Sequence, residues 1–106
     1  MQISIVDRDK KLLGFLQRIV GDSRLSPHHL ALATALCQRW IVNEFHYSYN
    51  VSRNMLMKAS RIRSQVTYHK VMKDLERYGY LRYNPSYHPK AGSVIILLFD
   101  FETVTS

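Results

Sequence analysis

The stretch that decides the fold is VSRNMLMKASRIRSQVTYHKVMKDLERYGYL, residues 51–81. Ser52 can cap a helix over residues 53–60, because its hydroxyl can accept a hydrogen bond from a free backbone N–H of the first turn. Ser64 offers a second cap, for a longer helix over residues 65–78. Because only a short turn, Ser60-Arg61-Ile62-Arg63, connects these segments, we expect two helices joined tightly to each other.

The second helix is expected to bury one side and to expose the other. Its apolar residues recur at offsets of three, four and seven, which places them on one stripe that faces a core. They are Tyr68, Val71, Met72 and Leu75. The opposite side contains Val66, His69, Lys70, Lys73 and Arg77. In the first helix, Leu56 and Ala59, with Ile62 beyond, are expected to form a shorter inward row.

Basic residues concentrate around these two helices. The chain has fifteen Lys and Arg against eight Asp and Glu, a formal net charge of +7. Residues 46–92 hold nine of the basic residues but only two acidic ones, Asp74 and Glu76. A positive surface that coincides with a helix-turn-helix pattern is typical of a phosphate-binding face. A basic surface can also serve solubility alone, but its coincidence with the motif favours nucleic acid.

We therefore expect the second helix to enter the major groove of double-stranded DNA. The residues placed to meet base edges are Gln65, Val66, His69, Lys70 and Lys73. A glutamine can form two hydrogen bonds to adenine, a lysine can reach guanine, and a valine can contact the methyl group of thymine. Contacts to the DNA backbone are expected from Arg53, Lys58, Arg61, Arg63, Ser64, Thr67, Arg82, Tyr87, His88 and Lys90. An ordinary solvated helix face is the competing interpretation for Lys73, and the preferred one for Arg77.

A β-hairpin is expected after the second helix. Gly79 stands where a left-handed helix end favours glycine, and residues 81–84 should pair with residues 93–99. The loop between them contains two prolines and a glycine, and near its tip lie Tyr87, His88 and Lys90. These side chains are suited to touching a phosphate or the minor groove, although they are also ordinary loop residues. Residues 49–51 can add a very short strand.

The segment before the motif supplies a scaffold. Residues 1–6 alternate weakly and form either a short strand or a disordered arm. Ser26-Pro27 begins a helix that should run to about Glu44, because a capping hydroxyl precedes a proline at the first helical position. Its inward residues are expected to be Leu30, Ala33, Cys37, Trp40 and Ile41, with Leu32 and Leu36 widening the face. His28 and His29 are expected to be solvated, since neighbours in sequence do not share a helix face and no further ligand completes a metal site.

Two apolar segments exceed what a small domain with one wet face requires. The run from Val94 to Phe99 does not alternate, so it needs cover on both sides, either from the N-terminal segment or from a second copy of the protein. The N-terminal helix, expected from Lys10 to Val20 with Asp7 as its cap, also has more apolar residues than one narrow buried stripe needs. Packing on this domain and formation of a homodimer both remain open for it.

Composition excludes several classes of protein. At 106 residues we expect one domain that folds without cross-links. The single cysteine, Cys37, cannot form an internal disulfide, which suits a reducing cytoplasm, and no apolar run is long enough to span a membrane. The chain contains no carboxylate pair, glycine-rich phosphate loop, metal-ligand cluster or nucleophile–base arrangement, so we expect neither an enzyme nor a cofactor or metal.

The predicted order of helix, helix-turn-helix and hairpin resembles the winged helix-turn-helix domain of bacterial transcription regulators. The segments Ser64-Gln65-Val66-Thr67-Tyr68 and Leu75-Glu76-Arg77-Tyr78-Gly79-Tyr80-Leu81 are similar to the corresponding helix of GntR-like and MarR-like regulators. The chain resembles more closely the small winged-helix proteins that integrated mobile elements of gut-type bacteria carry. The segments that carry this likeness are Leu25-Ser26-Pro27, Ala59-Ser60, Thr67-Tyr68-His69-Lys70 and Gly79-Tyr80 to Gly92-Ser93. The resemblance covers about residues 25–97.

This resemblance implies a mainly α fold with a small β-hairpin (α+β), in which the wing, residues 84–93, contacts the DNA backbone. Residues 25–100 would form the winged-helix domain, after an arm and helix at residues 1–24 for packing or dimerisation and before a tail at residues 101–106. The implied function is transcription regulation or an accessory role on a mobile element. A winged helix can instead bind protein, for example in a replication, excision or transfer complex.

The turn between the two helices departs from the pattern of such motifs. It usually holds a glycine in the left-handed region, and Ser60-Arg61-Ile62-Arg63 has none. Arg61 or Arg63 would then adopt that conformation at a cost of about 1 kcal/mol, or the turn takes another form.

Overall fold

The computed structural model describes residues 5–85 and 92–99. Its elements are α1 (Ile5–Gly21), α2 (Pro27–Val42), β1 (Tyr49–Val51), α3 (Arg53–Ser60), α4 (Gln65–Arg77), β2 (Leu81–Asn84) and β3 (Ser93–Leu97). The protein is thus mainly α with a small three-stranded antiparallel sheet, which confirms the expected α+β class. Predictions for residues 1–4, for Tyr87, His88 and Lys90, and for the tail at residues 101–106 lie outside the described residues.

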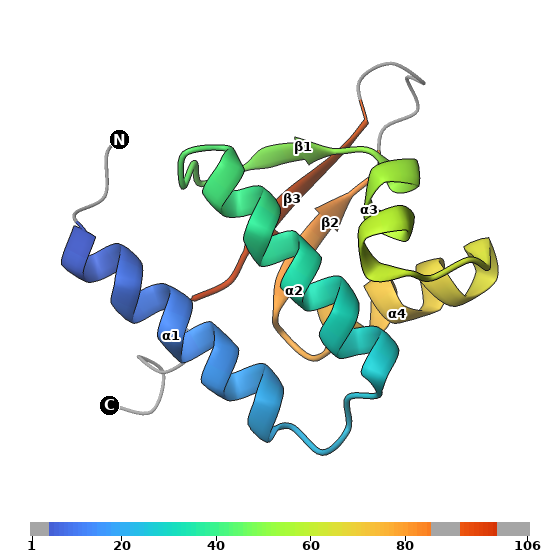
Figure 1. The fold of residues 1–106 in the computed structure, drawn as a ribbon, viewed down its shortest axis with the longest axis horizontal. Coiled ribbons are helices and arrows are strands. Elements are labelled where there is room, and N and C mark those ends of the chain that lie inside the picture. The colour runs from blue at the N-terminus through green and yellow to red at the C-terminus, as the bar shows by residue number, and fades with distance from the viewer. Residues whose placement is uncertain (1–4, 86–91, 100–106) are drawn as a thin grey trace.

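The helices are arranged around α2, which lies across one face of the sheet (Figure 1). α1 lies on one side of α2, and α3 and α4 lie on the other (Figure 1). Leu32, Leu36, Cys37 and Trp40 of α2 are buried, so Trp40 is a core residue as expected. Ile41 was wrongly expected inward and is 42% exposed, because the next position along a helix turns about 100° away from Trp40.

α2 ends at Val42 and not at Glu44. Glu44 and Phe45 have positive φ angles of 59° and 61°, which no α-helix allows. The N–H of Phe45 donates to the carbonyl oxygen of Trp40 at 2.9 Å, and the two rings meet edge to face with centroids 4.9 Å apart. The chain therefore reverses over the end of its own helix.

The sheet has the strand order β1-β3-β2, so β3 is its central strand. Ile95 pairs with Tyr49 of β1 and with Tyr83 of β2, which confirms the expected pairing of the two hairpin strands and the short first strand. β3 ends at Leu97, so its expected extension to Phe99 is wrong.

Ile95 and Leu97 are buried. The central position pairs both edges of the strand but covers neither face. Val94 and Ile96, which alternate with the buried Ile95 and Leu97, are half-buried, so the second face of the apolar run is partly covered.

α1 packs on this domain, through the buried side chains of Phe15 and Ile19. The ring centroids of Phe15 and Phe99 lie 5.7 Å apart, so α1 covers the end of the apolar run. Cover by the N-terminal segment was one of the two expected alternatives. The helix begins at Ile5, so a cap at Asp7 and a strand at Ile5 are both wrong. On the outer side of α1, Leu13 and Val20 remain exposed.

Polar contacts join the end of α1 to the end of α4. The hydroxyl of Tyr80 donates to Asp22 Oδ2 at 2.7 Å, and the Arg18 guanidinium lies 4.6 Å from the Tyr80 ring centroid. Burial, followed by the contact with Asp22, raises the pKa of Tyr80 to about 12. Gly79 has a φ of 87°, which confirms its expected role at the left-handed end of α4.

Candidate nucleic-acid interface

The candidate interface is built on α3, α4 and the turn between them. Ser52 Oγ accepts from the N–H of Met55 at 3.3 Å, and Ser64 Oγ accepts from the N–H of Thr67 at 3.2 Å, so both predicted caps are confirmed. The predicted apolar stripe of α4 is also confirmed, since Tyr68, Val71, Met72 and Leu75 are all buried. In α3 the inward row is Leu56 with Ile62 beyond it, but Ala59 is exposed and was wrongly assigned to it.

The turn between α3 and α4 has no glycine, and Arg61 adopts the left-handed conformation in its place. Arg61 has φ 63° and ψ 25°. The N–H of Ile62 donates to the Met57 carbonyl at 3.0 Å, and that of Arg61 donates to the Lys58 carbonyl at 3.3 Å. This pair of bonds is the Schellman pattern of helix ends, in which the left-handed position is normally glycine. An arginine at this position is strained by its left-handed conformation, but it adds a cation beside the start of α4.

Replacing Arg61 with glycine tests this conflict between stability and charge. We expect Arg61→Gly to raise the free energy of unfolding by about 1 kcal/mol, because glycine adopts a left-handed conformation without a Cβ penalty. Urea denaturation followed by circular dichroism measures it. An unchanged or lower stability would contradict the proposed strain at Arg61.

The residues predicted to meet base edges lie together on the outer side of α4. Val66 is 81% exposed, and Gln65, Lys70 and Lys73 are exposed, whereas His69 is half-buried beside the ring of Tyr68. In the first turn of α4, Val66 therefore presents an apolar side chain to solvent, where it can contact a bound partner.

The residues predicted to contact a DNA backbone divide into three groups. Those exposed on α3, the turn and the cap of α4 are Arg53, Lys58, Arg61, Arg63 and Ser64. Thr67 is half-buried, and Arg82 is exposed but lies on β2. Tyr87, His88 and Lys90 belong to the loop that the structure leaves undescribed.

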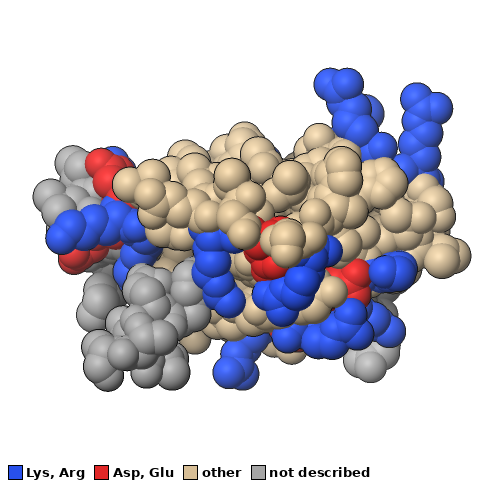
Figure 2. All heavy atoms as spheres, turned by 90° about the horizontal axis from the view of Figure 1, so that it is seen from below, with Lys and Arg blue, Asp and Glu red and all other residues tan. Residues whose placement is uncertain are grey.

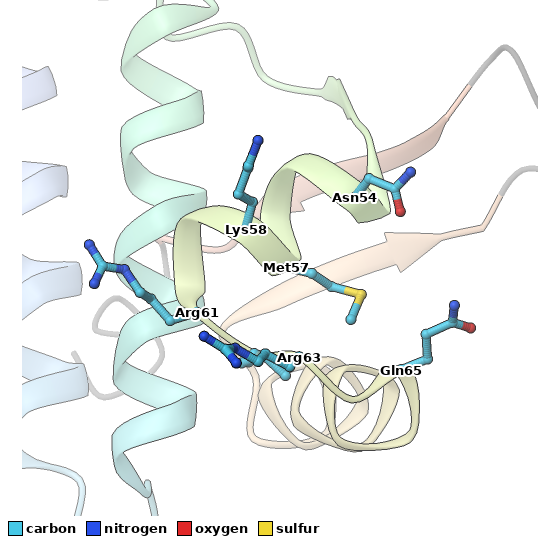
Figure 3. A pocket seen from close by; sticks show the side chains of 7 residues that line it. Asn54, Met57, Lys58, Arg61, Arg63 and Gln65 are labelled. Atoms are coloured by element: carbon cyan, nitrogen blue, oxygen red, sulfur yellow. The ribbon is translucent and has the colours of Figure 1, made fainter.

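Two hollows mark this side of the molecule. The first, of about 650 Å³, lies between α3 and α4 and is lined by Asn54, Met57, Lys58, Arg61, Ile62, Arg63 and Gln65. Figure 3 shows Met57 extending into the space between the helices, with Gln65 at the first turn of α4 and Arg61 and Arg63 extending from the turn. The second, of about 580 Å³, runs along α4 and is lined by Val66, His69, Lys70, Lys73, Asp74 and Arg77.

The charge on this half of the protein is mostly positive. Figure 2 shows the face seen from below, where Lys and Arg side chains outnumber acidic ones across the centre, and long basic side chains project from the end that α3 and α4 occupy in Figure 1. Such a surface attracts polyanions and concentrates them near the protein.

One buried contact was missed from the sequence. His29, expected to be solvated, is 6% exposed, and its Nε2 lies 2.9 Å from Asp74 Oδ2. The backbone N–H of Ser26 donates to His29 Nδ1 at 2.9 Å, so Nδ1 accepts and Nε2 donates to the carboxylate. The signal available in the sequence was the spacing from Ser26, because the third residue after a cap often returns a hydrogen bond to it. His28 is exposed, as expected.

Asp74 also binds two of the outer cations of α4. Lys70 Nζ lies 3.2 Å from Oδ2, and Arg77 Nη2 lies 2.8 Å from Oδ1. The hydrogen bond from His29 holds the pKa of this carboxyl below its ordinary value, and Lys70 and Arg77 lower it further, while burial opposes them. Arg77 is 69% exposed, in agreement with the preferred interpretation of a solvated helix face, and it is also paired along its own helix.

This lowered pKa predicts a loss of stability in acid. A carboxyl whose pKa is lower in the folded state stabilises the fold at pH values above its unfolded pKa, and this contribution disappears as the pH falls through the folded pKa. We expect the free energy of unfolding to fall below about pH 4, and to fall less in Asp74→Asn, which cannot titrate there. Urea denaturation from pH 7 to pH 2 measures both; parallel curves would contradict the role of Asp74.

Among the described residues, no three His, Cys, Asp or Glu side chains come together in a way that could hold a metal ion. No helix within residues 5–85 is both long and apolar enough to cross a membrane. Comparison with protein-family models, curated proteins and solved structures finds no match for this chain.

Proposed function

We propose that this protein is a sequence-specific DNA-binding protein of winged helix-turn-helix type that inserts α4 into the major groove. The observation that supports this most is the two-sidedness of α4. Its tyrosine, methionine and leucine side is buried, while Gln65, Val66 and Lys73 stand in solvent beside the cations of the turn. An α-helix fits the major groove, and polar or methyl-contacting side chains on its outer face can distinguish base pairs.

Within this proposal the residues have two kinds of task. Gln65 would bond adenine, Val66 would contact a thymine methyl group, and Lys73 would reach guanine, with His69 beside them. Lys70, exposed on the same side of α4, would reach guanine or an adjacent phosphate. Arg53, Lys58, Arg61 and Arg63 would bind phosphates and set the register of the helix in the groove. The hairpin of β2 and β3 follows α4 directly, where a wing would contact the backbone through Arg82. The physiological role would be transcription regulation or an accessory role on a mobile element.

Binding to duplex DNA at increasing salt concentration tests the proposal. With about four to six phosphates contacted, the logarithm of the association constant should fall against the logarithm of salt with a slope of roughly −4 to −5. Fluorescence anisotropy with a labelled random-sequence duplex measures this slope. No binding at low salt, or a slope near zero, would contradict the proposal.

A homodimer on α1 extends the proposal. Leu13 is 57% exposed and Val20 is 77% exposed, seven residues apart on one helix face, and a second copy would cover both. A two-fold dimer would place half-sites about one helical turn apart on DNA. Selection of bound sequences from a random pool gives the consensus and its symmetry together. A consensus without a repeat would contradict the dimer and leave DNA binding intact.

The same exposed pair favours the second candidate function, a protein-interaction module of a replication, excision or transfer complex. In that case α1 would bind a different protein, and the basic half of the surface would serve solubility. Retention on heparin or DNA that does not change with salt concentration would favour this candidate, because a protein interface on α1 does not require phosphate contacts.

A further inference from the structure

Asp74 is a buried residue at the border of the outer face of α4, next to the side chains proposed to meet DNA. It lines the hollow that also contains Val66, His69 and Lys73. A carboxylate in such a position repels phosphate, so its presence requires a physical reason. Its side chain is only 8% exposed, and each of its oxygens is engaged by a side chain.

The contacts of Asp74 differ in how firmly they are held. The bond from His29 joins two side chains that are each 8% exposed, and it comes from α2, 45 residues earlier in the chain. The two cations are solvated instead, since the side chain of Lys70 is 72% exposed and that of Arg77 is 69% exposed. Exposed ion pairs are weak and exchange readily. The carboxylate is thus fixed by the core, while its cations can leave it.

The side chain of Lys70 also extends in the direction that a helix disfavours. A lysine four residues before an acidic residue is the less favourable order for a pair on one helix, and side chains in a helix lean toward its N-terminus. Lys70 nonetheless extends toward Asp74, which lies on its C-terminal side. The fixed carboxylate therefore determines where the ammonium group rests when no DNA is bound.

We propose that Asp74 is a specificity-determining residue that competes with DNA phosphates for Lys70 and Arg77. It occupies both cations in the free protein, so a phosphate must displace the carboxylate before either cation can bind it. This lowers the affinity for DNA of any sequence and increases the share of affinity that comes from base contacts. The inference depends on the proposed DNA-binding function.

Asp74→Asn and Glu76→Gln form a matched pair for the test. Each removes one negative charge from α4, but Glu76 is exposed and its Oε2 accepts from the N–H of Tyr83 on β2. An asparagine can still accept the bond from His29 through its amide oxygen, while it no longer attracts Lys70 and Arg77. On a random-sequence duplex at low salt, we expect Asp74→Asn to bind about tenfold more tightly, with a salt slope steeper by about 1 to 2.

Glu76→Gln should change the affinity by less than about threefold, because it releases no cation of this face. Equal gains in the two variants would overturn the inference, since they would reflect total charge alone. In a Lys70→Gln, Arg77→Gln background the substitution at Asp74 should have no more effect than the one at Glu76; a retained tenfold gain would also overturn it. A wild-type protein that binds no DNA at low salt would instead overturn the proposed function.

A second comparison keeps Asp74 in place and does not depend on the folding of its variant. Lys70→Gln should weaken binding to the random-sequence duplex less than Lys73→Gln does, because Lys70 must first leave its carboxylate. Within the described residues Lys73 forms no ion pair. An equal or larger loss for Lys70→Gln would overturn the inference.

Discussion

Replacing Gly92 with alanine is expected to lower the free energy of unfolding by about 3 kcal/mol. Gly92 has a φ of 71°, which disfavours any residue with a Cβ, and it immediately precedes β3. A Cβ there would lie 2.7 Å from the carbonyl oxygen of Val51, a backbone atom of β1 that cannot rotate aside. Because Val51 pairs with Ser93, relief of the clash would separate the two strands at their first pair.

Two other glycines provide controls for this prediction. Gly79 has a φ of 87°, but a Cβ there would meet its nearest atom, Nη2 of Arg18, at an ordinary 3.6 Å, so Gly79→Ala should cost only about 1 kcal/mol. Gly14 lies inside α1 with nothing within 4 Å of a Cβ, so Gly14→Ala should stabilise by about 0.5 to 1 kcal/mol. Urea denaturation ranks the three variants. A Gly92→Ala variant no less stable than Gly79→Ala would show that β1 and β3 yield more easily than the geometry indicates.

The double substitution Lys58→Gln, Arg63→Gln is expected to weaken binding to DNA roughly fiftyfold at about 0.1 M salt. Both side chains are exposed and line the hollow between α3 and α4. If each binds one phosphate, their loss should make the salt slope less steep by about 2, because each contact releases close to one counterion. The fold should be unaffected, since both side chains point into solvent.

The control for this prediction is Lys10→Gln, Lys11→Gln, which removes the same charge from α1. It should change affinity by less than about threefold, because these side chains lie on a different helix from the proposed contacts and distant charges are screened. Anisotropy titrations at several salt concentrations compare the two proteins. Equal effects would mean that net charge and not position determines affinity, which would remove the support for a specific surface.

The helices of the candidate interface could be predicted because their signals are local. Ser52 and Ser64 cap the helices that their positions predicted, and Gly79 ends α4 in the left-handed conformation. The apolar spacing of α4 identified its buried side, because residues three and four apart share a helix face wherever the helix is packed. The outward position of Gln65, Val66 and Lys73 follows from the same periodicity.

The predictions that failed concern features that the local sequence pattern does not determine. Ile41 and Ala59 satisfy an apolar spacing but lie at the edge of their helix faces, where the position of the neighbouring helix decides burial. The start of α1 at Ile5 shows the same limit, since Asp7 is a good cap that the fold does not use as one. Arg61 represents an intermediate case, because the sequence left open a left-handed Arg61, a left-handed Arg63 or another form of turn, and the structure shows the first.

The sequence by itself determined the order of the helices and strands, the two-sidedness of α4 and the concentration of positive charge around it, since each depends on neighbours along the chain. Only the tertiary structure decided that β3 lies between β1 and β2, and that His29 reaches Asp74 across 45 residues. The physical reason is that these contacts join segments distant in sequence. Their partners become adjacent only after burial of apolar surface has brought the helices and the sheet together.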